Sequence, residues 1–258
     1  MRSPPSLCWS FAVLLLALPG CLVSFNDYPL GDLQPEAVAS GGRGAGGSFG
    51  TLPSGGAPAA VLGNTLVVDD FEDGNASILE QQGRSGAWYV ANDGRATQTP
   101  REGMQLLPSP LTPARGRSAH GAHTFGGPFP TWGALIGVPF AASGSEQVAY
   151  DLSDYEGLRL WVRSGTTGPG AATKVRVNLR TPATIMGQGC SVCGDHFGAD
   201  VPLTPQWVQV DIPWVSLKQV GFGQPLLTTP DLAHAMGIDL LFVTGVSFDL
   251  WIDDVELY

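Results

Sequence analysis

Apolar and polar residues alternate with a period of two in short segments along most of the chain. The segments that show this pattern, or that read as strands between turn residues, are 118–124, 132–140, 158–163, 175–180, 208–212 and 238–243. Clusters of Gly, Pro, Asp and Asn separate them, as expected for antiparallel strands that each bury one face. Only 215–219 and 231–235 are expected to form short helical turns. The pattern predicts an all-β sandwich of two antiparallel sheets and argues against enzymes built on βα units.

The first twenty residues have the pattern of an export signal. Arg2 precedes an almost wholly apolar run, residues 7–18, that is too short to span a bilayer. Gly20 then precedes Cys21, which resembles the lipobox of bacterial lipoproteins, although Pro19 departs from the usual small residue there. We therefore expect residues 1–20 to be removed and Cys21 to be lipidated. The alternative is an ordinary signal peptide in which this cysteine is incidental.

The lipidated cysteine would anchor the exported protein to a bacterial membrane. Leu22 follows Cys21 in place of an aspartate, so nothing argues for retention at the inner membrane, and we expect the outer membrane. Residues 21–63 are expected to be a tether, because residues 41–58 contain 8 glycines in 18 positions and can bury little apolar surface. Residues 64–258 are expected to form one β-rich domain.

The chain is acidic, with a formal net charge of −10 at pH 7, or −11 once Arg2 is removed with the signal. An acidic surface repels nucleic acid and anionic lipid headgroups. We therefore expect no nucleic-acid partner, and we expect a monomer.

Two acidic strands stand at opposite ends of the predicted domain. The first is 67–74 and the second is 248–258. Each places carboxylates among strand-forming residues, where an unpaired carboxylate is costly to bury. If the first and last strands lie side by side, these carboxylates can share a cation, and hard oxygen ligands favour calcium over zinc.

The acidic ends, together with aromatic segments between them, resemble a known family. In chain order the matching segments are Asp69-Asp70-Phe71-Glu72, Trp88-Tyr89, 158–161, 206–214 and 251–255. Their order and spacing resemble the galactose-binding-like β-sandwiches, most closely carbohydrate-binding module family eleven and its relatives, over residues 65–258. The resemblance implies a jelly roll with adjacent terminal strands and a polysaccharide or oligosaccharide as partner. Several tyrosines of a typical glucan-binding cleft have no obvious counterpart here.

The resemblance also implies a structural Ca²⁺ ion held by carboxylates from both terminal strands. By position the candidate ligands are Asp69, Asp70, Glu72 and Asp253. Strict alternation would place Asp253 on an inward face with Trp251 and Val255, where a carboxylate needs a partner. The alternative is that these acids hydrogen-bond to loop amides or to Arg84.

Candidate sugar-binding residues are aromatic side chains beside planar hydrogen-bonding groups. On the outward face of two strands these are Trp161 with Arg159 and Arg163, and Arg176 with Asn178 and Arg180. A second cluster contains Trp88, Asp93 and His123. The alternatives are that the arginines only cover apolar surface, that the histidine is satisfied by backbone groups, and that Trp88 belongs to the core.

The segment 187–198 is rich in potential ligands and contains Cys190 and Cys193. Outside the inner membrane these cysteines are expected to form a disulfide that makes the loop rigid. A zinc site with His196 lacks a clear fourth ligand, and a thioredoxin-like role lacks the βαβ setting. Asp195 and His196 are then candidates for the edge of the ligand face.

The acids also raise the question of a glycosidase, which uses paired carboxylates at a fixed separation. Here the acids of the domain gather at the terminal strands, where a structural cation explains them. The sequence therefore favours a non-catalytic carbohydrate-binding module displayed as a membrane-anchored lipoprotein. A structural or protein-interaction lipoprotein without a sugar ligand is the alternative, and a glycoside-active enzyme comes after it.

Overall fold

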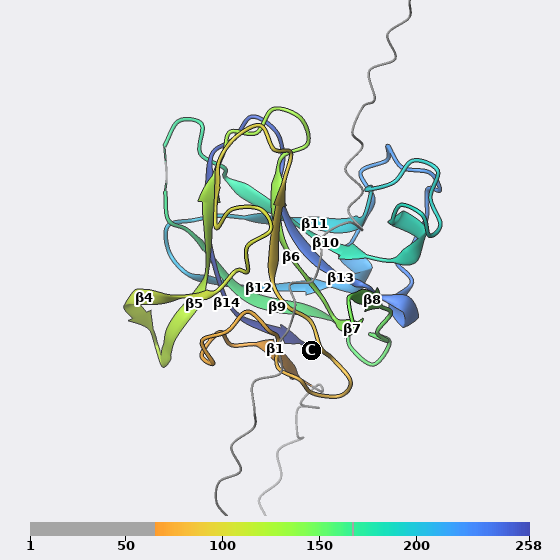
Figure 1. The fold of residues 1–258 in the computed structure, drawn as a ribbon, viewed down its shortest axis with the longest axis horizontal. Coiled ribbons are helices and arrows are strands. Elements are labelled where there is room, and N and C mark those ends of the chain that lie inside the picture. Colours follow the sequence, from red (N-terminus) through yellow and green to blue (C-terminus); the bar gives the residue numbers. More distant parts are fainter. Residues whose placement is uncertain (1–64, 167) are drawn as a thin grey trace, which may run out of the picture.

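Every strand that the alternation predicts is present in the computed structural model, which describes residues 65–166 and 168–258 (Figure 1). The strands are β1 (Leu66–Asp69), β2 (Tyr89–Asn92), β3 (Gln98–Thr99), β4 (Pro108–Arg115), β5 (Ser118–Gly126), β6 (Ala134–Pro139), β7 (Ala141–Ser143), β8 (Glu146–Val148), β9 (Gly157–Ser164), β10 (Lys174–Arg180), β11 (Phe197–Pro202), β12 (Val208–Pro213), β13 (Gly237–Phe242) and β14 (Phe248–Leu257). The helical elements of this described part are the 3-10 turns η1 (Pro182–Thr184), η2 (Trp214–Ser216) and η3 (Leu232–His234). The prediction of an all-β fold is confirmed.

The strands form two antiparallel sheets and a small hairpin. The seven-stranded sheet has the order β12-β9-β14-β5-β3, with β1 paired to β14 and β4 paired to β5. The five-stranded sheet has the order β11-β10-β13-β6-β2, and β7 pairs with β8. Leu66 of β1 lies opposite Leu257 of β14, so the first and last strands are adjacent. This arrangement confirms the predicted jelly-roll sandwich.

Period-two alternation places the core between the two sheets. In β9, Leu158, Leu160 and Val162 are buried, while the residues between them are half-exposed. Inner-face side chains of both sheets form one apolar cluster, which also contains the rings of Phe71 and Trp88. Removing this apolar surface from water is the main favourable term in folding. Trp88 is 1% exposed, so this candidate ligand residue lies in the core.

Strand β14 departs from strict alternation at one point. Its pairing with β9 shifts register just after Asp253, and Asp254 has a positive φ of 41°. Because this bulge adds one residue, Val255 points into the core while Asp253 stays on the outer face with Trp251. The predicted inward face shared by Asp253, Trp251 and Val255 is therefore wrong. Asp253 is buried because Arg115 of the β4–β5 hairpin lies against it.

The two strands expected to share a ligand face lie in different sheets. Strand β9, with Trp161 and Arg163, belongs to the seven-stranded sheet, and β10, with Arg176 and Arg180, belongs to the five-stranded sheet. Their outward side chains therefore point to opposite sides of the sandwich. The prediction of one shared face is wrong, because alternation indicates which side chains point outward but not which strands are neighbours.

The predicted signal peptide 1–20, the lipidation site Cys21 and the tether 21–63 lie outside the described residues. Within 65–166 and 168–258, no helix has both the length and the apolar character needed to cross a bilayer.

Candidate functional site

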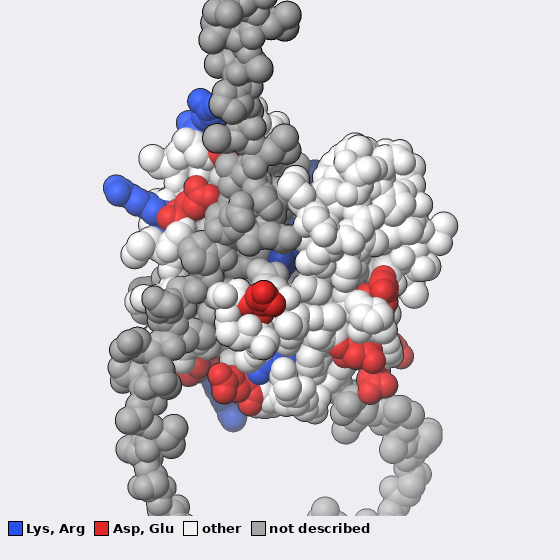
Figure 2. Space-filling view, turned by 45° about the vertical axis from the view of Figure 1, so that its right-hand side comes forward, with Lys and Arg blue, Asp and Glu red and all other residues white. Residues whose placement is uncertain are grey.

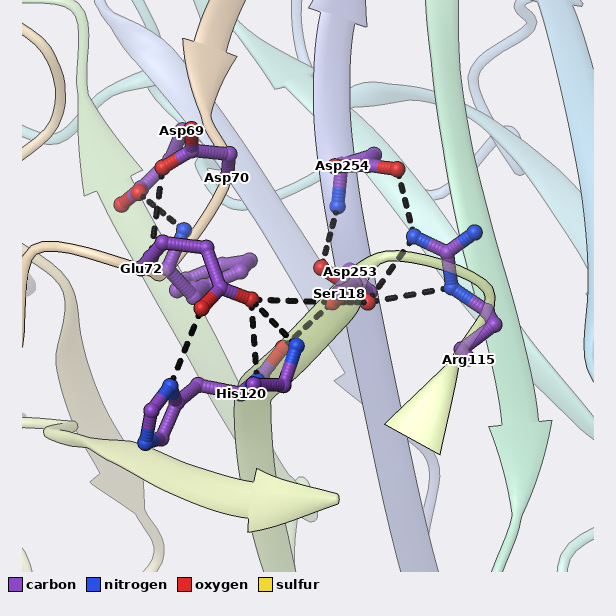
Figure 3. Close-up of polar contacts among 10 residues, drawn as sticks. Asp69, Asp70, Glu72, Arg115, Ser118, His120, Asp253 and Asp254 are labelled. Atoms are coloured by element: carbon purple, nitrogen blue, oxygen red, sulfur yellow. Dashed lines mark hydrogen bonds and ion pairs between the residues drawn. The ribbon is translucent and has the colours of Figure 1, made fainter. Parts of the chain in front are cut away.

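The buried acid of the first strand is satisfied by donors of the protein itself (Figure 3). Asp69 accepts hydrogen bonds from the Phe71 amide at 2.8 Å and from the Trp88 indole Nε1 at 2.7 Å. Burial raises the pKa of Asp69 to about 7, because the Phe71 and Trp88 donors offset the desolvation only in part. Asp70 is partly exposed and accepts the Glu72 amide at 3.2 Å. Asp69 is thus a buried carboxyl poised between its charged and neutral forms.

Glu72 and Asp253 meet at Ser118 of β5 (Figure 3). The Ser118 Oγ lies 3.1 Å from Glu72 Oε1 and 2.5 Å from Asp253 Oδ2. Glu72 Oε1 also accepts the amides of Ala119 at 2.7 Å and His120 at 2.9 Å. Burial alone would raise the pKa of Glu72, but the donors of His120, Ala119 and Ser118 outweigh it and hold the pKa at about 2. Glu72 therefore ties the segment after β1 to the start of β5.

Arg115 supplies the positive charge of this network. Its Nε donates to Asp253 Oδ2 at 3.0 Å, its Nη2 lies 2.9 Å from the same oxygen, and it also contacts Asp254. Burial raises the pKa of Asp253, while Ser118 and Arg115 lower it. Removing one partner of such a buried pair leaves an uncompensated charge, which costs about 3–5 kcal/mol in comparable cases. The pair therefore fixes the β4–β5 hairpin on β14.

Calcium does not fit these acids as the structure arranges them. The oxygens of Asp69, Glu72 and Asp253 already accept hydrogen bonds from amide, indole, hydroxyl or guanidinium donors, whereas Ca²⁺ takes about six to eight oxygen ligands. In the described part of the chain, no three His, Cys, Asp or Glu side chains gather where they could hold a metal ion. A calcium site at these acids stays a prediction, and it would require the present donors to be displaced.

The outer face of the seven-stranded sheet carries a continuous stack of aromatic and cationic side chains. We call it the stacked row, and its members are Trp207, Arg163, Trp251, His123 and Phe125. Trp251 lies opposite Arg163 on β9 and opposite His123 on β5. The rings of Trp251 and His123 are 3.9 Å apart and inclined by 11°, and the Arg163 guanidinium lies 4.9 Å from the Trp251 centroid. Neighbouring strands are ~4.8 Å apart, so flat groups in register on adjacent strands meet at stacking distance.

The stacked row also carries hydrogen-bonding groups. His123 Nε2 lies 2.8 Å from Asp249 Oδ1, and Thr166 Oγ1 donates to Asp249 Oδ2 at 2.8 Å. Burial lowers the pKa of Arg163, and Asp249 opposes this. The buried Nε of Arg163 has no hydrogen-bond partner among the described residues. With Phe125 42% exposed at one end, the row offers ring surface beside planar donors and acceptors, which is the chemistry that holds a sugar's C–H faces and hydroxyl groups.

The other two outward residues of β9 are engaged by neighbours. The Arg115 guanidinium lies 4.5 Å from the ring centroid of Trp161 and covers it. Arg159 forms a bidentate pair with Asp211 at 2.6 and 2.8 Å. Of the three residues expected on this face, only Arg163 belongs to the stacked row.

The outer face of the five-stranded sheet carries a second polar row, which is covered. Asn178, Asp239 and Tyr89 stand in register on β10, β13 and β2, with Gly198 and Gly137 on the strands next to them. Tyr89 donates its hydroxyl to Asp239 at 3.0 Å directly over Gly137. A Cβ at Gly137 would lie 2.4 Å from the Asp239 carboxylate and 2.6 Å from the Tyr89 hydroxyl, so glycine is required there. We call this set the covered polar row.

Arg180 and His196 lie between the covered polar row and the loop that covers it. Arg180 lies 3.2 Å from Asp239 and donates to Gln147 at 2.8 Å, and His196 Nδ1 lies 2.6 Å from the Thr184 hydroxyl. Burial lowers the pKa of His196 to about 4, so the ring is neutral at pH 7. The cavity beside these groups has a volume of about 20 Å³, which is room for about one water molecule. A sugar residue does not fit in it.

The loop with the two cysteines helps to cover this row. Cys190 and Cys193 form a disulfide with their Cα atoms 5.2 Å apart, which confirms the predicted pairing. Asp195 is buried, and its carboxylate accepts the amides of Val220 at 2.7 Å and Gly221 at 2.8 Å. Burial alone would raise the pKa of Asp195, but these amides outweigh it and hold the pKa below its usual range. Asp195 therefore clamps two loops together and is not at the edge of an open ligand face.

The remaining predicted residues are placed apart from the stacked row. Arg176 pairs with Asp200 at 3.4 Å and donates to the Lys218 carbonyl on the five-stranded sheet. Asp93 accepts the amides of Thr131 at 2.7 Å and Trp132 at 3.2 Å and holds that loop. Of the ten predicted ligand residues, the structure brings only Arg163 and His123 together in the stacked row, with Trp161 beside them.

Sequence reasoning missed the residues that complete both rows. They are Trp207, Trp251, Phe125 and Asp249 on one face, and Asp239 on the other. Period-two counting back from Ile252, an obvious core residue, would have placed Trp251 outward. The neighbours of Trp251 could not have been found this way, because strand order decides them.

Solved structures of carbohydrate-binding modules are similar to this chain, whereas no protein-family model and no curated protein match it. A family 11 module of a cellulosomal cellulase of Clostridium thermocellum aligns with a TM-score of 0.47 and 14% identity over 75% of this chain and 93% of that one. A family 11 module from Clostridium thermocellum in complex with a β-1,3-1,4-mixed-linked tetrasaccharide aligns with a TM-score of 0.48 and 17% identity. This alignment covers 75% of this chain and 94% of that one. A family 30 module of a cellulosomal cellulase from the same organism aligns with a TM-score of 0.43 and 13% identity. This alignment covers 71% of this chain and 96% of that one.

The donor pattern around the acids predicts that calcium does not stabilise the protein. The melting temperature of the mature chain is expected to be the same in millimolar-range CaCl₂ and in excess chelator, because a cation would have to displace the hydrogen bonds that Asp69, Glu72 and Asp253 already accept. Differential scanning calorimetry measures this. A rise of several degrees in calcium would show that the acids rearrange around a cation, as the sequence predicts.

The raised pKa of Asp69 predicts that the stability of the fold depends on pH. Its pKa is about 7 in the fold and near 3.8 when exposed, so the fold favours the protonated form. The contribution of this group to the free energy of unfolding is therefore complete below about pH 4 and falls, by up to about 4 kcal/mol, as the pH rises to about 7. Asp69→Asn does not titrate, so it removes this fall; its amide nitrogen cannot accept one of the two hydrogen bonds, which lowers the stability equally at every pH. Urea unfolding from pH 4 to 8 checks it, with Asp70→Asn as the partly exposed control; parallel curves for wild type and Asp69→Asn would contradict the prediction.

Proposed function

We propose that this chain is a non-catalytic carbohydrate-binding module, displayed as a lipoprotein on the outer membrane, and that a polysaccharide or oligosaccharide binds along the stacked row. The observation that supports sugar binding is the row itself. Trp207, Trp251 and Phe125 line up on an accessible sheet face, with Arg163 and His123 between them. Sugars are recognised by this combination of apolar ring surface and a few fixed hydrogen-bonding groups.

The stacked row is a better sugar site than the covered polar row. The arginine and carboxylate of the covered polar row, Arg180 and Asp239, are both nearly fully buried, and the adjoining cavity is about 20 Å³. A ligand there would first have to displace the loops that cover it. The stacked row lies open on the sheet, and its members come from β9, β14, β5 and the segment before β12, which are rigid elements. Its groups are therefore held in place before a ligand arrives.

Membrane display is supported by the lipobox-like sequence that ends at Cys21. The disulfide between Cys190 and Cys193 agrees with export, because disulfides persist in oxidising compartments. Residues 22–64 place 43 positions between the predicted anchor at Cys21 and Thr65, the first residue that the structure describes.

One observation favours a second candidate, a structural or protein-interaction lipoprotein without a sugar ligand. Within the stacked row each ring lies against its neighbour, so that Trp251 is flanked by His123 on one side and Arg163 on the other. Stacking of this kind can stabilise a sheet face without any ligand. The two candidates differ in whether a saccharide binds to the row.

A glycan array probed with the mature chain, followed by calorimetric titration of the best saccharide, tests sugar binding. Phe125→Ala and Trp251→Ala are each expected to weaken binding roughly tenfold, since an aromatic contact contributes about 0.5–1.5 kcal/mol beyond its buried area. Phe222→Ala is the matched control, because Phe222 is also an exposed phenylalanine, at 57%, but lies outside the row. Silence on the array, or equal loss in the control, would contradict the proposal and favour the second candidate.

A further inference from the structure

Two loops of the described chain form a surface without any charged side chain. Residues 182–194 and 219–230 contain no Asp, Glu, Lys, Arg or His, although the chain as a whole has a net charge of −10. We call them the uncharged lobe. They lie on the right-hand side of Figure 1, and Figure 2, which brings that side forward, shows a broad white surface there with acidic side chains below it.

The uncharged lobe exposes large apolar side chains. Five of its residues are between 37% and 67% exposed, namely Val192, Val220, Phe222, Leu226 and Leu227. A cluster of exposed apolar groups on a rigid scaffold is unfavourable in water and marks a surface that meets something else. Exposed apolar residues elsewhere in the described chain, such as Met104, stand in segments that also carry charged residues.

Internal bonds hold these side chains outward. The Asp195 carboxylate accepts the amides of Val220, Gly221 and Gly223 at 2.7 to 2.9 Å. The Gln219 side chain donates to the Asp195 carbonyl at 2.8 Å and accepts the Leu227 amide at 2.6 Å. These bonds fix the backbone of the lobe, and with it the positions from which the apolar side chains project into solvent.

Further bonds join the two loops of the lobe to each other. Val192 and Gln224 form an antiparallel bridge, with the Gln224 amide donating to the Val192 carbonyl at 2.9 Å. The disulfide between Cys190 and Cys193 closes the tip of the first loop. The lobe is therefore one preformed unit, and docking it would cost little ordering entropy.

We propose that the uncharged lobe docks on the lipid bilayer, with Phe222 and Leu226 entering the headgroup and acyl boundary. This inference rests on the membrane anchorage in the proposed function. Side chains of this type on loops insert into the interface through burial of apolar area. An acidic surface is repelled by anionic lipid, whereas the lobe has no charged side chain and can approach a bilayer without this repulsion.

The length of the chain before the domain permits this contact. Residues 22–64 separate the predicted anchor at Cys21 from Thr65, and 43 residues can span a distance of at most about 150 Å. That distance lets the domain turn until the lobe faces the lipid. The anchor also keeps the lobe at a high effective concentration near the bilayer, so that even a weak contact is occupied.

Docking through the lobe would orient the sugar site. The lobe lies over the outer face of the five-stranded sheet, since Thr184, Ile185 and Gly194 line the cavity beside Arg180 and Asp239. The stacked row lies on the outer face of the other sheet. A lobe seated on the membrane therefore points the stacked row away from it, toward any polysaccharide outside.

Flotation with vesicles tests the lobe separately from the lipid anchor. The full mature chain carrying Cys21→Ser, which cannot be acylated, is mixed with phosphatidylcholine vesicles. Weak binding is expected, and the added pair Phe222→Ser and Leu226→Ser is expected to reduce it at least tenfold. At low salt, phosphatidylglycerol vesicles are expected to bind the chain less well than phosphatidylcholine vesicles, because the rest of the surface is acidic.

Met104→Ser with Leu107→Ser is the matched control, since both residues are exposed apolar side chains, at 61% and 52%, outside the lobe. No binding to phosphatidylcholine, or equal loss in the control, would overturn the inference. A dimer in sedimentation equilibrium that the Phe222 and Leu226 substitutions abolish would also overturn it, because a second copy would then occupy the lobe. Saccharide binding by the lobe variant is expected to be unchanged, so failure of the docking inference is distinct from failure of the proposed function.

Discussion

Pairing of the first and last strands is the constraint on which the rest of the structure depends. Because β1 lies against β14, the acids that follow β1 come close to the acids of β14, and each buried carboxylate must find donors. The fold supplies them from within: the Trp88 indole for Asp69, and Ser118 with Arg115 for Asp253. These contacts attach the β4–β5 hairpin and a core tryptophan to the terminal strands. They also occupy the oxygens that a cation would need.

The two outer faces of the sandwich differ in how much of their polar and aromatic rows is accessible. On the seven-stranded sheet the bulge after Asp253 keeps Trp251 outward, in register with Arg163 and His123, and the resulting row stays accessible. On the five-stranded sheet an equally ordered polar row is closed over by two clamped loops. One face thus carries exposed rings and planar donors, and part of the other is covered by the uncharged lobe, beside the ion pair of Arg176 and Asp200.

Much of the fold could be predicted from the sequence, but less of the site. Alternation in 158–163 and in the similar segments predicted the strands. The order of the acidic and aromatic motifs predicted the sandwich and its adjacent terminal strands. Three features could not be predicted from the sequence. A bulge changes the phase of β14 without a sequence signal as strong as a glycine, since Asp254 occupies it. Strand order also could not be predicted: it places Arg163 beside Trp251, whereas Arg176 lies on the other sheet. Burial of Arg180 and Asp239 depends on loops that carry no periodicity.

The claim that a saccharide binds to the stacked row is tested most directly by following the tryptophan indole N–H signals in an NMR titration of the mature chain with the saccharide it binds best. The account predicts that the signals of Trp251 and Trp207 shift, while those of Trp88 and Trp214, which are buried, stay in place. Unchanged Trp251 and Trp207 signals at saturating saccharide, or shifts confined to Trp88 and Trp214, would contradict the account.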